Sequence, residues 1–594
     1  MVLRAKRYSY SPNIIEVKKD DLLILRFISE DVTHGFFLDG YGTEFYAHPG
    51  EIREIIIKAN KVGRFTFRCS RTCGEFHPYM VGYLIVTPNW HQHLGFLLIF
   101  LFGIFSLVLT ITGKQSPQNK LFWKIPLNWR FELTKFKWFH SIVKSRFFPL
   151  IPIIVNLFIF TVIIFAAFVG GFQPGNYNFG IMIVWILWWS LLMLFMVPII
   201  GRFWCMICPF PLFGDWFQRG SLVKVKRKKL NGMNKKWVRN LRNLWPLVIL
   251  FWITTLFSGF FTVRPFATFL LLAAIIIGAC IIAIIYEKRT FCLYICPVSG
   301  FQGLYSNFSM TEIRVKDPEI CKNHRTKDCI TGNDKGYGCP WQELPFDMNR
   351  NTYCGMCFEC IKTCTYDNMA FNIRPPGVDF LNPRKKTDDL YKRRDLDEAF
   401  KALTMLGIFL TFFLAFQGPF QYFKDTIRAI TLPKFLTYIL ESAFLDFVFV
   451  PLTYLFFVFI SKKLSGKRDI SLRKIFVEYS YTLVPIGLAV WAAFSLAIIL
   501  PNGSYLWHII SDPFAWGWNL FGTARIPWKP YLTNFLPYLQ IFVLIFGFIF
   551  ALEYGYKFSR NLYKNEEKAK KGWIPILIYL ILLNLFFVFI FLGG

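Results

Sequence analysis

The sequence predicts a multidomain membrane protein built from an N-terminal all-β sandwich, about ten transmembrane α-helices and a small cysteine-rich insert. Its 594 residues are 54% hydrophobic with a mean hydropathy of +0.40, which is too apolar for an ordinary soluble protein. The first 89 residues instead contain short apolar segments separated by Gly, Pro and Asp, as strands are. All of the 14 cysteines except Cys280 fall in closely spaced groups, which indicates metal sites rather than a disulfide framework.

The N-terminal domain, residues 1–89, is predicted to be a β-sandwich. Segments of strand length alternate or run apolar between turn residues, as half-buried strands do. These segments are Ile14–Leu25, Glu54–Lys58, Gly63–Cys69 and Gly82–Thr87. We expect the domain to end near Asn89.

The transmembrane helices are predicted from apolar runs of roughly 18 residues or more, the length that crosses a bilayer. The predicted spans are residues 94–112, 147–170, 181–201, 245–262, 266–286, 402–423, 435–460, 476–500, 535–554 and 573–591. The first five fall in residues 90–296 and the last five in 401–594, with the cysteine-rich insert at 297–400 between them.

The orientation of the chain follows from where its basic residues lie. Lys and Arg gather in loops such as 113–146 and 202–244, whereas the alternate loops, such as 171–180, carry little charge. Because basic loops stay in the cytoplasm, we expect a multi-pass protein of the cytoplasmic (inner) membrane with the β-domain outside and the insert inside. We also expect the natural start to lie upstream of Met1, because no export signal precedes Arg4.

The net charge of +30 does not indicate a nucleic-acid-binding protein, because the charge is divided among these short loops. We find no nucleic-acid-binding motif. Membrane lipid is the expected partner of this surface.

The stretch Cys69–Met80 places two thiols, an imidazole and a thioether within twelve residues, and Asp31-Val-Thr-His34 supplies a second imidazole. Sulfur and imidazole ligands together suit copper. A mononuclear blue-copper site uses only one Cys, whereas two thiolates can bridge two copper ions. The alternative is a structural disulfide between Cys69 and Cys73 with an incidental histidine.

The C-x3-C-x3-H-x2-M pattern with a distant His resembles the binuclear CuA site of cytochrome oxidase subunit II and nitrous oxide reductase. The resemblance implies a cupredoxin fold in which Cys69 and Cys73 bridge the coppers and His34 and His77 each bind one. It also implies weak ligands from the Met80 thioether and the Arg71 carbonyl. The family often has Glu at the Arg71 position, but the departure matters little because only the backbone carbonyl would bind.

The insert contains Cys354, Cys357, Cys360 and Cys364 in the C-x2-C-x2-C-x3-C spacing of bacterial ferredoxins. A four-cysteine zinc site is the alternative, although such sites usually come as two separated pairs. In the ferredoxin interpretation the fourth Cys of the run serves a second cluster. The first [4Fe-4S] set is then Cys354, Cys357, Cys360 and Cys339, and the second is Cys364, Cys321, Cys329 and His324. His324 is equally well explained as a surface loop residue, so the sequence predicts one cluster or two.

Two further cysteine pairs, Cys205–Cys208 and Cys292–Cys296, each follow an inward-running span and precede a proline. They form either one shared thiol or metal site at the membrane surface or separate reduced thiols. With the insert, residues of about 180–375 resemble the membrane-bound polyferredoxins of the NosR/NapH kind. That family often has three residues between the paired cysteines, whereas the first pair here has two. The resemblance implies electron transfer in respiratory nitrogen-oxide metabolism, or support of reductase maturation.

We therefore expect an electron-transfer protein rather than an enzyme with its own organic substrate, because no catalytic triad, carboxylate pair or nucleotide-binding loop is present. The expected cofactors are binuclear copper and one or two 4Fe-4S clusters, and a quinone, a partner subunit or an unrecognised cofactor must fill the gap between the two ends. The expected partners are an extracytoplasmic copper reductase or cytochrome, nitrous oxide reductase among them by resemblance, and a cytoplasmic or quinol electron donor. The alternative is an assembly or regulatory protein for the copper site of a partner enzyme. The sequence argues against an oxygen-reducing oxidase, because none of the eight His falls in the middle of a span.

Two features of the remaining spans and loops are open to a functional interpretation. Asp446 lies inside a predicted span, where acidic side chains are functional candidates by default. The loop 501–534 is rich in Trp, which favours an interfacial aromatic belt over docking of the β-domain.

Overall fold

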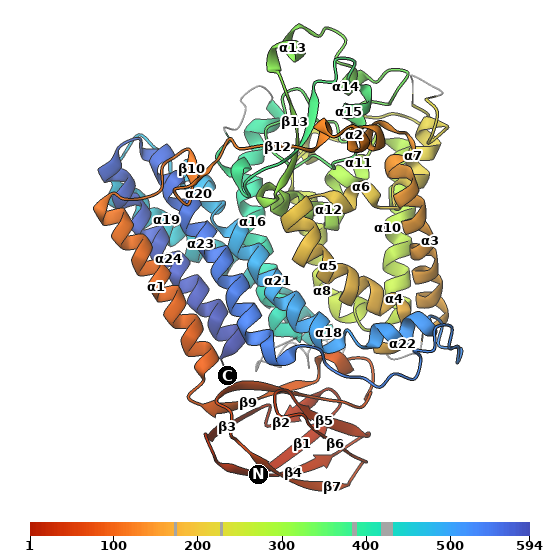
Figure 1. The fold of residues 1–594 in the computed structure, drawn as a ribbon, viewed down its shortest axis with the longest axis vertical. Coiled ribbons are helices and arrows are strands. Elements are labelled where there is room, and N and C mark those ends of the chain that lie inside the picture. The colour runs from red at the N-terminus through yellow and green to blue at the C-terminus, as the bar shows by residue number, and fades with distance from the viewer. Residues whose placement is uncertain (172–174, 226–229, 383–388, 417–431, 594) are drawn as a thin grey trace.

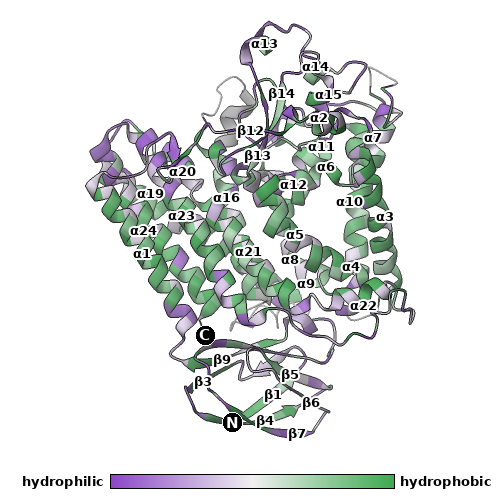
Figure 2. Cartoon of the chain, in the orientation of Figure 1, coloured by the Kyte–Doolittle hydropathy of each residue, from purple (hydrophilic) through white to green (hydrophobic). Residues whose placement is uncertain are grey.

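The computed structural model describes residues 1–593 except 172–174, 226–229, 383–388 and 417–431. The chain has three tiers (Figure 1). The β-domain lies at one end, the helices form the middle, and the cysteine-rich region lies at the opposite end. Figure 2 shows an apolar helical tier between polar end regions, as a bilayer requires.

The β-domain is a sandwich of two sheets, as the sequence predicts. One sheet has the order β2-β1-β4-β7 and the other β3-β9-β8-β5-β6. The strands are β1 (Val2–Lys6), β2 (Ser9–Ser11), β3 (Ile14–Lys18), β4 (Leu22–Ser29), β5 (His34–Leu38), β6 (Thr43–Ala47), β7 (Ile52–Lys58), β8 (Gly63–Arg68) and β9 (Val81–Thr87). In β4 buried and exposed residues alternate strictly at first, because successive side chains point to opposite faces.

The predicted strand Ile14–Leu25 is two strands. The chain turns at Asp20, whose φ of 69° is left-handed, and β3 and β4 then join different sheets. The run of apolar residues on both sides hides this turn in the sequence. Asp tolerates the left-handed conformation better than most residues do.

The structure contains eight helices that are long and apolar enough to cross a membrane within its described residues. They are Trp90–Thr112 (α1), Phe147–Val169 (α3), Phe179–Ile200 (α4 to η5), Pro265–Ile285 (α10), Leu432–Ser465 (α18 to α19), Leu472–Asn502 (α20 and α21), Thr533–Tyr563 (η10 and α23) and Glu566–Leu592 (α24). Each coincides with a predicted span. The predicted span 245–262 is a shorter pair of helices, α8 (Trp245–Leu256) and α9 (Ser258–Phe261).

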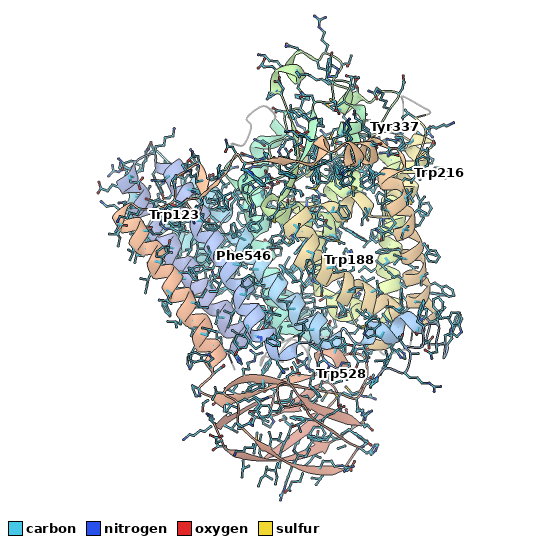
Figure 3. All side chains as sticks on the ribbon, in the orientation of Figure 1. Trp123, Trp188, Trp216, Tyr337, Trp528 and Phe546 are labelled. Carbon is cyan, nitrogen blue, oxygen red and sulfur yellow. The ribbon has the colours of Figure 1, made fainter. Side chains whose placement is uncertain are left out.

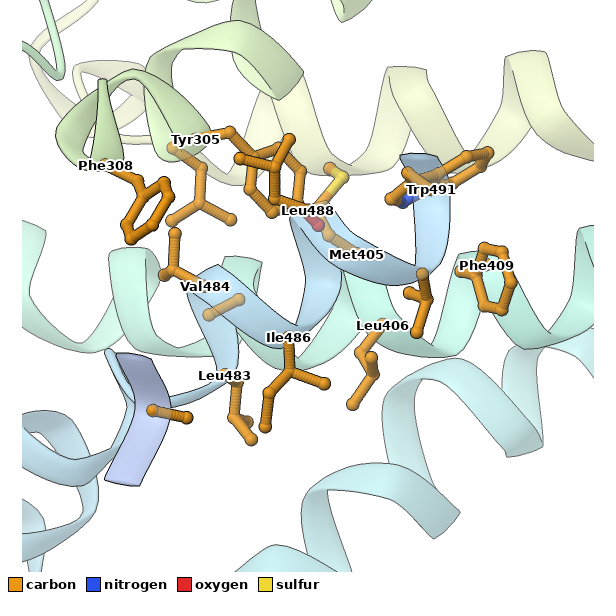
Figure 4. Close-up of a cluster of buried hydrophobic side chains, with 14 of the residues drawn as sticks. Tyr305, Phe308, Met405, Leu406, Phe409, Leu483, Val484, Ile486, Leu488 and Trp491 are labelled. Atoms are coloured by element: carbon orange, nitrogen blue, oxygen red, sulfur yellow. The ribbon is translucent and has the colours of Figure 1, made fainter. Parts of the chain in front are cut away.

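The sixth predicted span, 402–423, lies partly in α16 (Asp389–Phe416), and its remainder falls outside the described residues. Because α16 begins well before residue 400, the predicted boundary of the insert falls inside a helix. Helix α21 (Leu483–Asn502) packs on α16 in the centre of the helical tier. Figure 4 shows Leu406 and Phe409 of α16 beside Ile486 and Trp491 of α21.

The cysteine-rich region is built from three stretches of the chain. Its sheet has the order β12-β14-β13, with β12 (Phe131–Glu132), β13 (Thr311–Val315) and β14 (Met369–Ile373). Short helices α6 (Phe203–Ile207), α11 (Thr290–Tyr294), α12 (Pro297–Tyr305), α13 (Pro318–Asn323), α14 (Asp328–Thr331) and α15 (Glu359–Thr363) surround it. Strand β12 comes from the basic loop after α1, so that loop adds a strand to the sheet of the cysteine-rich region.

Candidate metal centres

The outer candidate site lies where β5 and β8 meet at the edge of the sandwich that faces the helices (Figure 1). The antiparallel pairing of Phe37 with Arg68 places the strand of His34 beside the start of the cysteine loop. The short 3-10 helix η1 (His77–Tyr79) then returns the chain to β9. The two cysteines, both histidines and Met80 are all buried.

Each thiol in this site lies close to an imidazole. Cys69 Sγ lies 3.8 Å from Nδ1 of His34, and Cys73 Sγ lies 3.7 Å from Nδ1 of His77. His34, Cys69 and Cys73 also offer ligand atoms within 4.8 Å of one another. The structure thus brings the four strong donors predicted from the sequence into one cluster.

The two predicted weak ligands lie close to different thiols. Met80 Sδ is 3.7 Å from Cys73 Sγ, and the Arg71 carbonyl oxygen is 3.0 Å from Cys69 Sγ. Each thiol therefore has an imidazole and one weak ligand close to it. Such a set matches the soft ligands that copper prefers.

Both imidazoles are held through the nitrogen that faces away from the thiols. Nε2 of His34 is 2.8 Å from Asp31 Oδ1, and Nε2 of His77 is 3.2 Å from the Tyr505 hydroxyl. Metal-binding histidines are usually oriented in this way by a second group. Sequence reasoning missed both partners, although Asp31 lies only three residues from His34.

The charges around the cluster favour a thiolate. Burial alone would raise the pKa of Cys69, but hydrogen bonds with Cys73, His34 and His77 hold it well below its usual value. Burial would lower the pKa of His34, but Cys69 and Asp31 raise it above its usual value. The site is thus polar and compact before any ion is considered.

The loop 501–534 docks the β-domain, contrary to the prediction of an aromatic belt alone. Tyr505, at the start of α22 (Tyr505–Ser511), contacts His77. The Trp528 ring meets Phe37 edge to face, with centroids 5.5 Å apart, and Figure 3 shows Trp528 at the junction of the two tiers. A loop more than 400 residues away in sequence therefore completes the surroundings of the outer site.

At the opposite end, the first predicted iron-sulfur set is gathered in one place. Burial raises the pKa of Cys360 well above its usual value, and the neighbouring thiols of Cys354, Cys357 and Cys339 raise it further. Burial likewise raises the pKa of Cys354 to about 11. Buried thiols that repel one another as anions are stabilised in that form by a bound cation, so this donor set fits a metal cluster.

The three cysteines of the second set also lie together. Burial raises the pKa of Cys329 to about 11, and the thiols of Cys321 and Cys364 contribute to the rise. His324 Nε2, in contrast, lies 2.8 Å from Thr326 Oγ1, and its ring packs edge to face on Tyr366. The structure therefore gives this imidazole partners of its own in the loop.

The two pairs that follow the membrane spans meet at the end of the helical tier. Burial raises the pKa of Cys208 well above its usual value, and the thiols of Cys292, Cys296 and Cys205 add to the rise. This group also adjoins the first set, because Cys205 and Cys339 belong to one buried cluster with Cys357 packed against it. Three cysteine groups thus form a continuous series from the insert to the membrane face.

Comparison with known proteins identifies two regions. Residues 11–86 match the family model of the cytochrome C oxidase subunit II, periplasmic domain. Residues 181–230 and 268–315 match the model of a 4Fe-4S binding domain. The latter two segments contain the pairs Cys205–Cys208 and Cys292–Cys296, whereas the run from Cys354 to Cys364 lies outside both.

The curated relatives match a short part of this chain. Two cytochrome c oxidase subunits 2, one from Thermus thermophilus and one from a named strain of the same species, are each 30% identical over 79 residues. The match covers 13% of this chain and 58% and 47% of the two relatives, so the chain spans about half their length.

A solved structure of a heme-copper terminal oxidase dimer is 26% identical over 14% of this chain and 62% of the other, with a TM-score of 0.14. The assignment of the two domains rests on the two family models. By their matches, the chain joins a cupredoxin domain of the cytochrome c oxidase subunit II family to a 4Fe-4S binding domain in one membrane protein.

Proposed function

We propose that this protein carries electrons across the cytoplasmic membrane between iron-sulfur clusters at its cytoplasmic face and a binuclear copper site at its outer face. The observation that carries the proposal is that two soft-ligand donor sets lie at opposite ends of one helical tier (Figure 1). The matched domains are both of electron-carrying kinds. The outward position of the β-domain is supported by the basic loops at the other end and by the periplasmic character of its family.

In the outer site, Cys69 and Cys73 would bridge two coppers, with His34 and His77 each completing one of them. The Met80 thioether and the Arg71 carbonyl would each supply one weak ligand. A bound copper pair would supply one-electron transfer with little rearrangement. The chain itself contributes burial, which excludes water, and the outer hydrogen bonds to both imidazoles.

In the inner region, Cys339, Cys354, Cys357 and Cys360 would hold one 4Fe-4S cluster. Cys321, Cys329 and Cys364 would hold a second, with His324 as the predicted fourth ligand after its ring turns from Thr326. The pairs Cys205–Cys208 and Cys292–Cys296 would hold a further metal at the membrane face, an interpretation supported by the 4Fe-4S domain match.

The donor and acceptor follow from the chemistry of the two ends. The outer copper site would serve an extracytoplasmic copper reductase or cytochrome, and nitrous oxide reductase is the acceptor that the resemblance favours. The electron donor would be a cytoplasmic carrier or a membrane quinol. In this role the protein belongs to a respiratory chain.

Metal analysis and EPR of the full-length purified protein test the proposal. We expect two coppers per chain and, in the oxidised protein, a signal from one electron shared by two copper nuclei. Cys69→Ser should abolish that signal because it removes a bridge, whereas Met80→Leu should keep both coppers and shift the reduction potential. A signal from a single copper nucleus, or copper that leaves for a partner protein during turnover, would contradict the proposal, and the latter would favour an assembly role.

A further inference from the structure

Arg202 is a buried cation that has no acidic partner among the described residues. Its side chain is enclosed, with the whole residue only 2% exposed. Other buried arginines each form an ion pair with a carboxylate. These pairs are Arg68 with Asp39, Arg289 with Asp215 and Arg374 with Asp379. Because buried charges are normally paired, Arg202 lacks the counter-charge that the other three have.

The Arg202 guanidinium connects two of the cysteine groups. Arg202 immediately precedes α6, and its Nη1 donates to the carbonyl oxygen of Thr352 at 2.7 Å. Thr352 lies two residues before Cys354 of the first iron-sulfur set. Arg202 Nη2 donates to the hydroxyl of Ser299, three residues after Cys296. One cation therefore lies between the first set and the pairs at the membrane face.

The carboxylate that contacts the same loop is already engaged. Glu398 of α16 accepts a hydrogen bond from the Thr352 hydroxyl at 3.0 Å and pairs with Arg350. Burial raises the pKa of Cys354 and of Cys296 to about 11, whereas the charge of Arg202 acts on both thiols in the opposite direction. The groups that feel this charge are thus the cysteines themselves.

The ring of Trp341 holds the guanidinium in place. Arg202 Cζ lies 4.4 Å from the centroid of that ring, and a tryptophan face attracts a cation. Trp341 Nε1 and Arg202 Nε are buried and make no hydrogen bond within the described chain. A Cβ atom on Gly355 would lie 2.1 Å from Trp341 Nε1, so this edge borders the loop between Cys354 and Cys357. A sulfur acceptor in the first set would satisfy such a donor.

We propose that Arg202 is the buried counter-cation of the 4Fe-4S cluster in the first set and raises the reduction potential of that cluster. A cluster held by four thiolates carries net negative charge, and net charge is one of the factors that set its potential. Reduction adds one electron and no proton, while Arg202 stays protonated. The added negative charge is therefore stabilised by a cation that solvent ions screen little. This inference rests on the proposed function of the inner region.

The test is a redox titration of the full-length protein followed by EPR. The signal of the first set is the one that disappears in Cys354→Ser. Arg202→Gln removes the charge but keeps an N–H donor, and should lower the equilibrium constant for reduction of this cluster by about tenfold. For one electron, that change equals a potential about 59 mV lower. Arg202→Lys keeps the charge and should stay within about threefold of the unaltered protein.

Lys335→Gln is the matched control, because it removes a cation of the same insert from an exposed position, where solvent screens it. Its potential should equal that of the unaltered protein. The proposal is overturned if Arg202→Gln contains the cluster and its potential is unchanged. It is equally overturned if Arg202→Lys lowers the potential as much as Arg202→Gln, since shape rather than charge would then be responsible.

Iron and sulfide analysis accompanies every titration. If Arg202→Gln assembles no cluster, Arg202→Lys decides the question: it supports the proposal when it contains the cluster at the unaltered potential, and overturns it when the equilibrium constant falls tenfold or more. Unaltered protein without iron and sulfide would disprove the proposed function at its inner end, and this inference with it. Clusters that are present but insensitive to the charge of Arg202 would disprove this inference alone.

Discussion

At the scale of single residues, the geometry of the outer site depends on the groups that contact the two imidazoles as well as on the metal donors themselves. Asp31 holds His34, and Tyr505 holds His77, so that each Nδ1 faces a thiol. These contacts come from a loop of the β-domain and from the helical tier, respectively. The ring orientation of His77, a residue of the β-domain, therefore depends on a contact with the helical tier.

Asp31→Asn tests how much the contact between Asp31 and His34 contributes to copper affinity. The change keeps the shape of the side chain but removes the charge of Asp31, which together with Cys69 raises the pKa of His34. We expect about a tenfold loss of copper affinity, the lower end of what a supporting residue contributes. Competition against a chelator measures it, and Glu30→Gln, an exposed neighbour that pairs with Arg4, is the control. Equal affinity in the two variants would show that Asp31 has no such role.

At the scale of elements, the cysteine-rich region is fixed by a buried ion network beside its sheet. Arg374, just after β14, pairs with Asp379 and Glu312, and all three side chains are buried. Burial would raise the pKa of Asp379, but Arg374 and Arg314 hold it below its usual value. The stabilisation is therefore present above the ordinary aspartate pKa of about 4 and is lost as the pH falls through the lower native value.

Asp379→Asn should destabilise this region by about 3 kcal/mol at pH 7, because it removes one partner of a buried cation. The apparent melting temperature followed by fluorescence measures the change. Glu319→Gln, whose exposed carboxylate pairs with Lys322, should leave it unchanged. The difference between Asp379→Asn and the unaltered protein should shrink as the pH falls below about 4, and a difference that stays constant would refute the ion-pair explanation.

The cysteine pairs that follow two of the spans are a second feature of this scale. α6 and α11 bring Cys205, Cys208, Cys292 and Cys296 to one place. If they share a metal, replacing all four with Ser should remove one cluster's worth of iron and sulfide while the signals of the insert remain. Iron content and redox titration measure this, and unchanged metal with every cluster signal intact would exclude the shared site.

At the scale of the whole molecule, the two candidate redox ends lie on opposite sides of the helical tier (Figure 1). If the basic loops are cytoplasmic, reporters fused after Gly175 and after Gly220 should lie on opposite sides of the membrane. These residues flank the span Phe179–Ile200. Equal reporter activity at the two positions would refute the proposed orientation.

Features whose residues are neighbours along the chain can be predicted from the sequence. The spacing of Cys69, Cys73, His77 and Met80 predicts a shared site because one loop can carry all four. The apolar runs likewise predict each span found in the described residues, because a helix that crosses a bilayer needs about 20 consecutive apolar residues and such a run is visible in the local sequence.

The folded structure, in contrast, is needed to show which distant segments come into contact. It turned the chain at Asp20, it placed Tyr505 against His77, and it brought the two membrane-face pairs beside Cys339. It also placed Arg202 against both Thr352 and Ser299. Such contacts arise from the packing of faces whose partners are far apart along the chain, and no local spacing records which faces will meet.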